Sequence, residues 1–97
     1  MGKHATFWEV TETDVFLYKE DGLVAEGIAY DIYMHEWYDD IDDYERESAH
    51  GEIIIVDGKE VDIDYDEVVW ESETIVETDI DNYNDAEKLL YEVSGYK

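Results

Sequence analysis

The sequence predicts an α+β fold: an antiparallel β-sheet of about five or six strands, with a C-terminal amphipathic helix packed on one face. Three observations lead to this prediction. Apolar and polar residues alternate with a period of two along most of the chain, two Asp-Gly pairs stand where hairpin turns are expected, and the period becomes helical only near the end. No proline, repeat or linker interrupts the 97 residues, so one domain spanning residues 1–97 is expected.

The first half of the chain reads as three strands. They are expected over residues 6–10, 15–20 and 23–29. The pair Asp21-Gly22 favours a two-residue hairpin turn between the second strand and the third. The third strand can continue through residues 30–38, where apolar side chains still alternate, and a short helix is the alternative for this segment.

The middle of the chain begins with an acidic segment, residues 39–47, which carries six acids in nine positions without a clear period and is expected to form a loop or one helical turn. Further strands are then expected over residues 53–56, 60–65 and 68–78, with a second hairpin turn at Asp57-Gly58. Both faces of residues 53–56 are apolar. That strand is therefore either central and covered on both sides, or it shelters part of an acidic face.

The end of the chain predicts an amphipathic helix. Ala86, Leu89, Leu90 and Val93 follow the spacing i, i+3, i+4, i+7 that places them on one helical face. Asn84 is the expected N-cap and Glu87 the expected acid of a capping box, whereas Gly95 suits the position after the last turn.

The charge of the chain is extreme. Twenty-nine residues are Asp or Glu and six are Lys or Arg, which gives a formal net charge of −23. Such a charge is typical of disordered chains, but a content of 44% hydrophobic and 14% aromatic residues provides enough apolar surface for a small core. The chain has no cysteine, its N-terminus lacks the apolar segment of a signal peptide, and no apolar run is long enough to span a membrane. A cytoplasmic location is expected.

The segment EVDIDYDE, residues 60–67, concentrates this charge by placing an acid at every second position. In a strand these carboxylates would line one face at intervals of about 6.6 Å. Like charges at that spacing repel, so the row lowers stability and indicates a functional surface.

Metal binding and catalysis have weaker support in the sequence. Residues 62–73 match a calcium-binding loop at Asp62, Asp64, Asp66 and Glu73, but Glu67 stands where the loop requires glycine. The histidines, at positions 4, 35 and 50, are far apart, and no phosphate-binding loop or nucleophile motif occurs. We therefore expect no metal, no cofactor and no enzymatic activity.

The charge does match that of a nucleic acid. A compact domain of this length has a diameter of roughly 33 Å. Duplex DNA of that length carries roughly 20 negative charges, close to the net charge of the chain. The composition thus favours a surface that basic, nucleic-acid-binding proteins recognise.

In size, charge and aromatic content the whole chain resembles the small acidic DNA-mimic inhibitors that phages use against host defence, the anti-restriction and anti-CRISPR class. The resemblance rests on no shared motif, so no residues are carried over. It implies a mechanism in which the protein occupies the basic surface of a CRISPR-Cas effector, a restriction nuclease or a similar enzyme and excludes its substrate. It implies neither direct binding of nucleic acid nor contact with a membrane, and the chain can be a monomer or a homodimer.

Two groups of residues are the candidate partner-binding site. The first is the acidic segment with one tyrosine, namely Asp39, Asp40, Asp42, Asp43, Tyr44, Glu45 and Glu47. The second is the predicted strand face with the following segment, namely Glu60, Asp62, Asp64, Tyr65, Asp66, Glu71, Glu73 and Glu77. The alternatives are an acidic adaptor or antitoxin-like module that binds a basic protein without copying DNA, and a calcium-binding module.

Overall fold

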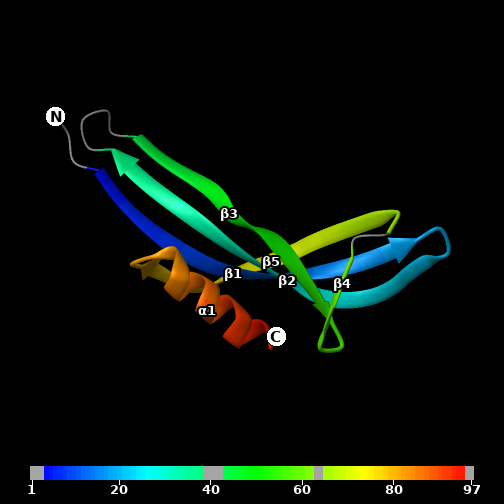
Figure 1. Cartoon of the computed structure of the whole chain (residues 1–97). Coiled ribbons are helices and arrows are strands. Elements are labelled where there is room, and N and C mark those ends of the chain that lie inside the picture. Colours follow the sequence, from blue (N-terminus) through cyan, green and yellow to red (C-terminus); the bar gives the residue numbers. More distant parts are fainter. Residues whose placement is uncertain (1–3, 39–42, 63–64, 96–97) are drawn as a thin grey trace.

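The protein forms one antiparallel sheet with a single helix on it, as the computed structural model of the chain shows for residues 4–38, 43–62 and 65–95 (Figure 1). The strands are β1 (His4–Lys19), β2 (Gly22–Tyr38), β3 (Asp43–Val56), β4 (Lys59–Val61) and β5 (Glu67–Ile80), and the helix is α1 (Tyr83–Ser94). Their order across the sheet is β4-β3-β2-β1-β5. The predicted α+β class, with the C-terminal helix packed on the sheet, is confirmed.

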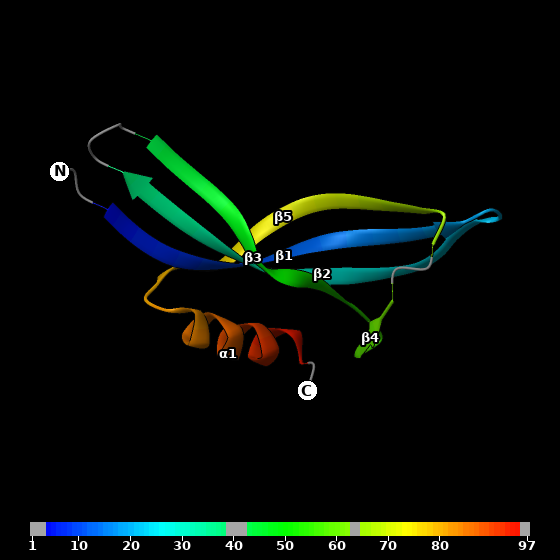
Figure 2. The same cartoon turned by 45° about the horizontal axis from the view of Figure 1, so that its top comes forward.

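The molecule is elongated, with principal extents of 56 × 26 × 18 Å and a radius of gyration of 15.7 Å. The expected compact body with a diameter of roughly 33 Å is therefore wrong. The reason is the length of two strands, since β1 has 16 residues and β2 has 17 and they run side by side as a long curved ribbon (Figure 2).

The strands predicted over residues 6–10 and 15–20 are parts of the single strand β1. The intervening polar residues continue the pairing, and Thr11, which is opposite Asp31, is buried. Strand β2 continues to Tyr38, so the strand alternative for residues 30–38 is correct. The turn between β1 and β2 consists of residues 20–21, one position earlier than predicted. Gly22 is the first residue of β2 and has a φ of 121°.

Strand β3 begins at Asp43, so the loop or helical turn predicted over residues 39–47 is wrong for residues 43–47. Residues 39–42 lie outside the described residues. The segment extends because β2 offers it a partner as far as Tyr38, which is paired with Asp43. Tertiary pairing has thus overridden a local sequence that shows no strand period.

The predicted strand over residues 60–65 is also wrong beyond its start. The Asp57-Gly58 turn is present, with φ values of 52° and 79° that suit a tight hairpin, but β4 ends at Val61. Asp62 and Asp66 lie outside any strand, residues 63–64 lie outside the described residues, and the Asp66 amide donates a hydrogen bond to the Tyr18 carbonyl at 2.9 Å. The expected regular row of carboxylates is therefore not formed.

Two apolar clusters cover opposite faces of the sheet. The first lies under α1 and includes Val10, Ile32, Ile53 and Leu90. The second lies on the other face, near β4, and consists of buried Val15, Leu17, Ala29 and Ile54 with half-buried neighbours. Because Ile53 belongs to one cluster and Ile54 to the other, the segment 53–56 is covered on both sides, which was one of the two predicted arrangements.

Strand β5 is an edge strand with an irregular register. Its pairing with β1 shifts at three places, and Ser72 and Asp79 have positive φ values of 59° and 58°. Each shift places an extra β5 residue opposite β1, which is the pattern of a β-bulge and bends the strand. Along its length β5 follows the curve of β1, its single neighbour in the described sheet (Figure 1).

Helix α1 confirms the predicted C-terminal element, but its cap differs. Asn82, not Asn84, is the N-cap, because its Oδ1 accepts a hydrogen bond from the Asp85 amide at 2.8 Å. Gly95 ends the helix in the left-handed conformation, as predicted. Ala86 and Leu90 are fully buried against the sheet.

Candidate functional site

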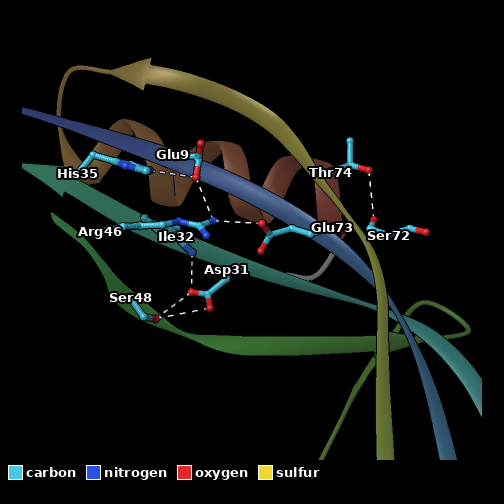
Figure 3. Close-up of polar contacts among 9 residues, drawn as sticks. All are labelled: Glu9, Asp31, Ile32, His35, Arg46, Ser48, Ser72, Glu73 and Thr74. Atoms are coloured by element: carbon cyan, nitrogen blue, oxygen red, sulfur yellow. Dashed lines mark hydrogen bonds and ion pairs between the residues drawn. The ribbon is translucent and has the colours of Figure 1, made fainter. Parts of the chain in front are cut away.

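The sheet face opposite α1 carries a group of polar side chains, most of which are drawn in Figure 3. We call this group the polar network. Its members come from four strands and are Glu9, Asp31, Tyr33, His35, Arg46, Ser48 and Glu73. Because residues two apart on a strand point to the same side, Glu9 and Thr11 on β1, like Asp31, Tyr33 and His35 on β2, all point away from the helix-covered face.

The centre of the polar network is a buried carboxylate, Glu9, which is 4% exposed. Its Oε1 lies 3.0 Å from Nε2 of His35, which is 5% exposed and stacks on Phe7 with ring centroids 4.6 Å apart. A carboxylate only accepts hydrogen bonds, so Nε2 of His35 carries the hydrogen. His35 is thus held by packing on one side and by a charge-assisted contact on the other.

Arg46 links three strands through one guanidinium group. Its Nη2 donates to Oε1 of Glu9 at 3.1 Å and to Oε1 of Glu73 at 3.4 Å, and its Cζ lies 3.6 Å from the ring centroid of Tyr33. Burial lowers the pKa of Arg46, but the carboxylates of Glu73 and Glu9 outweigh it and raise that pKa above its ordinary value. Arg46 is the single arginine of the chain, and its Nη2 donates to both carboxylates.

Asp31 forms the second half of the polar network. Its Oδ1 accepts hydrogen bonds from the Ile32 amide at 2.7 Å and from the Ser48 hydroxyl at 3.2 Å. Burial raises the pKa of Asp31 despite these hydrogen bonds, which favour the charged form. The sheet therefore holds a carboxylate that is costly to ionise, next to the paired charges of Glu9 and Arg46.

A hollow of about 270 Å³ adjoins the polar network and opens to solvent. Its lining comes from β1, β3 and β5 and consists of Thr13, Glu52, Trp70, Glu71, Ser72 and Glu73. We call it the Trp70 hollow. Burial, followed by the carboxylates of Asp31 and Glu73, raises the pKa of Glu52 in its wall. The indole of Trp70 forms an apolar wall beside these acids. Trp70 is 41% exposed.

Acidic residues also face one another across neighbouring strands. Asp14 on β1 is paired with Glu71 on β5, and Glu36 on β2 is paired with Glu45 on β3. Like charges directly opposite each other in an antiparallel pair are destabilising. At Asp14 and Glu71 the sheet thus accepts a repulsion that an oppositely charged pair would relieve.

The first predicted group of partner-binding residues lies at the start of β3. Asp39, Asp40 and Asp42 lie outside the described residues, and the backbone of Asp43 and Tyr44 is in the strand. Glu45 and Glu47 are exposed. They alternate with Arg46, which points to the polar network, so they point to the opposite side of the sheet.

The second predicted group is divided by the fold. Glu60, Asp62 and Asp66 are exposed around the short strand β4 and the connection after it, and Asp64 lies outside the described residues. Glu71, Glu73 and Glu77 are exposed along β5. The structure therefore brings Glu71 and Glu73 together at the Trp70 hollow, but it does not join them to Glu60 and Asp62 in one row.

Tyr65 differs from its predicted role as an exposed contact residue. It is half-buried against the second apolar cluster, and the Lys19 ammonium lies 5.7 Å from its ring centroid. Tyr65 thus attaches the chain after β4 to the second apolar cluster of the sheet.

Residues outside both predicted groups form the centre of the site. Glu9, Asp31, Arg46, Glu52 and Trp70 were not predicted as site residues. Alternation alone places Tyr33, His35 and Trp37 on one strand face, which was the available signal for a polar surface there. The contribution of β3 and β5 depends on register shifts that the sequence does not reveal.

The structure gives no support for a metal site or a membrane span where it describes the chain. In that part, no three His, Asp or Glu side chains lie close enough to hold an ion. No described helix has both the length and the hydrophobicity to cross a bilayer.

Together, the fold and the site define a class in structural terms: an elongated acidic sheet protein with one face under a helix and the other carrying a polar network. Comparisons with protein-family models, with curated proteins and with solved structures find no match.

Proposed function

We propose that the protein is a nucleic-acid mimic, which binds the basic nucleic-acid-binding surface of another protein and blocks substrate binding. The target class that fits is a phage-defence enzyme of the host cytoplasm, such as a CRISPR-Cas effector or a restriction nuclease. The observation that carries the proposal is the distribution of a net charge of −23 along a body 56 Å long. In this proposal the chain acts by occupancy, without catalysis or a cofactor.

The linear charge density supports the proposal. A net charge of −23 over 56 Å corresponds to one negative charge per about 2.4 Å, compared with about 1.7 Å of axis for duplex DNA. The two shorter extents, 26 and 18 Å, give the molecule a rod-like cross-section of the same order as the width of a duplex. A groove shaped for duplex DNA can thus accommodate a molecule of this length, width and charge.

A cross-strand pair of acids gives a second line of support. The pair Asp14–Glu71 lowers stability, and one lysine at either position would reverse the sign of the interaction. Acids that persist where they oppose folding are explained when a partner supplies the missing positive charge. The carboxylates then act as phosphate equivalents spread over several surfaces, in place of the single regular row expected from residues 60–67.

The test is competition with DNA. A target is first captured from a host lysate and purified, and inhibition of its activity is then measured at rising concentrations of its own DNA substrate. Competitive inhibition is expected, with an apparent affinity that falls steeply as salt increases. If excess DNA leaves the inhibition unchanged and the target binds DNA and this protein together, the mimic proposal fails and an acidic adaptor takes its place.

Matched charge variants then locate the binding surface. A triple variant of sheet residues, Glu47→Gln with Glu71→Gln and Glu77→Gln, is compared with Glu20→Gln, Asp81→Asn and Glu92→Gln, which lie at the first hairpin turn and around α1. Both variants change the net charge by the same amount. The sheet variant is expected to slow association more strongly, because charges at the interface steer encounter more than distant ones. Equal rates would mean that the sheet acids are not the recognition surface.

A further inference from the structure

We infer that the Trp70 hollow is a receptor for one arginine side chain of a basic partner protein, with the guanidinium stacked on Trp70 and paired with Glu52. The inference deepens the proposed function, on which it rests for the identity of the partner, and names the chemical group that the partner inserts.

The shape of the Trp70 hollow provides the space. It measures about 270 Å³, is open to solvent, and is bounded by the exposed indole of Trp70 on β5 and by Glu52 on β3. The positive φ of Ser72, 59°, marks the bulge that bends β5 at this point. A bulge re-aims neighbouring side chains, so the hollow results from a specific backbone feature of the edge strand.

The chemistry of the wall selects a cation with a flat face. The indole of tryptophan is the best aromatic partner for a cation, and carboxylates pair with a guanidinium through two parallel hydrogen bonds. Arginine combines both contacts because it is planar and weakly hydrated, whereas the lysine ammonium is compact and strongly hydrated. Burial and, after it, the carboxylates of Asp31 and Glu73 raise the pKa of Glu52, and a cation in the hollow would offset the contribution of these carboxylates.

The protein itself shows the same chemistry beside the hollow. Arg46 stacks at 3.6 Å on Tyr33 and donates to Glu73, whose carboxylate also contributes to the hollow. An aromatic ring with flanking glutamates thus already holds one guanidinium on this face. The hollow offers a second aromatic ring with flanking glutamates, and the chain has no second arginine to fill it.

The experiment uses the isolated protein and a small probe, N-acetyl-arginine amide, followed by the shift of the Trp70 indole N–H in two-dimensional NMR spectra. Trp70→Phe assigns that signal among the three tryptophans of the chain. We expect a saturable shift of the Trp70 signal, with binding at least about threefold tighter than for N-acetyl-lysine amide at equal ionic strength. Glu52→Gln should weaken binding, whereas Glu20→Gln, which makes the same charge change at the β1–β2 turn, should not.

Several outcomes would overturn the inference. A linear shift equal to that caused by sodium chloride would mean that the hollow binds no cation specifically, and equal affinities for the two probes would exclude selection of arginine. The same signal change for Trp8, which packs against Tyr83 under α1, would show a general effect. The result is independent of any partner. If the hollow does not bind arginine, the DNA competition test still decides whether the protein is a nucleic-acid mimic. If the competition test fails, saturable binding of arginine by the isolated protein would still stand.

Discussion

Nη2 of Arg46 lies 3.4 Å from Oε1 of Glu73, although two other strands separate β3 from β5 in the sheet. A flat sheet would hold these residues apart. The contact therefore shows that the sheet curls toward the face that carries the polar network. Glu9, on one of the intervening strands, accepts from the same nitrogen and completes the connection.

Removal of Arg46 should destabilise the fold. Glu9 is buried, and Arg46→Ala leaves its carboxylate with less positive charge nearby, at an expected cost of about 1–3 kcal/mol in the free energy of unfolding. Glu73→Gln is the control, because the exposed ion pair between Arg46 and Glu73 should contribute only about 0–1 kcal/mol to the free energy of unfolding. Chemical denaturation measures both variants. Equal, small effects would show that His35 alone satisfies Glu9.

Salt should stabilise the protein. Repulsion among the 29 acids is screened over a Debye length of about 10 Å at 0.1 M salt, so the melting temperature should rise between about 10 and 300 mM sodium chloride. The triple variant Glu20→Gln, Asp81→Asn and Glu92→Gln should show a smaller rise in the same calorimetric series. A flat response of the parent protein would contradict net repulsion.

The raised pKa values of Asp31 and Glu52 predict a pH dependence with a definite sign. A carboxyl group whose pKa is higher in the folded state binds protons more readily there, so its contribution to stability is present at low pH and is lost as pH rises through the folded pKa. Glu52→Gln should therefore match the parent protein below the ordinary carboxyl pKa of about 4 and exceed it in stability at neutral pH.

The measurement is the difference in unfolding free energy between Glu52→Gln and the parent protein from pH 3 to pH 7, with Glu20→Gln as a charge-matched control at the β1–β2 turn. A difference for Glu52→Gln that stays constant over this range, or that favours the parent at neutral pH, would refute the assigned direction.

Gly27 should tolerate no side chain. A Cβ there would lie 2.6 Å from the Ile55 carbonyl oxygen and 2.8 Å from Cγ2 of Val56, so Gly27→Ala must displace β3 and should cost about 1–3 kcal/mol. At Gly51 a Cβ meets nothing within 4 Å, and Gly51→Ala should be neutral or slightly stabilising. Denaturation midpoints of the two variants test the contrast, and similar midpoints would contradict it.

The sequence predicted the elements that depend on local patterns. Helix α1, the Asp57-Gly58 turn and the continuation of β2 follow from periodicity and turn chemistry. The extension of β3 through residues 43–47 did not follow, because it depends on the partner that β2 offers. The end of β4 at Val61 did not follow either. Alternation over residues 60–67 resembles a strand, and β3 continues beyond Ile54, the partner of Val61, but the chain leaves β3 there and the Asp66 amide donates to the Tyr18 carbonyl.

The sequence predicted that the candidate site is acidic, but not which residues meet there. Glu71 and Glu73 were named, but their proximity to Glu52 and Trp70 depends on the β5 bulges, which the sequence does not mark. In a chain with so many acids, composition cannot distinguish the buried Glu9 from exposed glutamates. The single arginine is the most informative residue of the sequence, because one guanidinium among 29 acids should find several partners.

The long β1–β2 hairpin has a hydrodynamic consequence. An extent of 56 Å gives one chain more drag than a compact protein of equal mass, and it should leave a gel-filtration column ahead of globular standards. The strong charge adds to this effect at low salt, because it excludes the molecule from resins that carry residual negative groups. An early peak is therefore expected for a single chain, and light scattering is the measurement that separates a monomer from a homodimer.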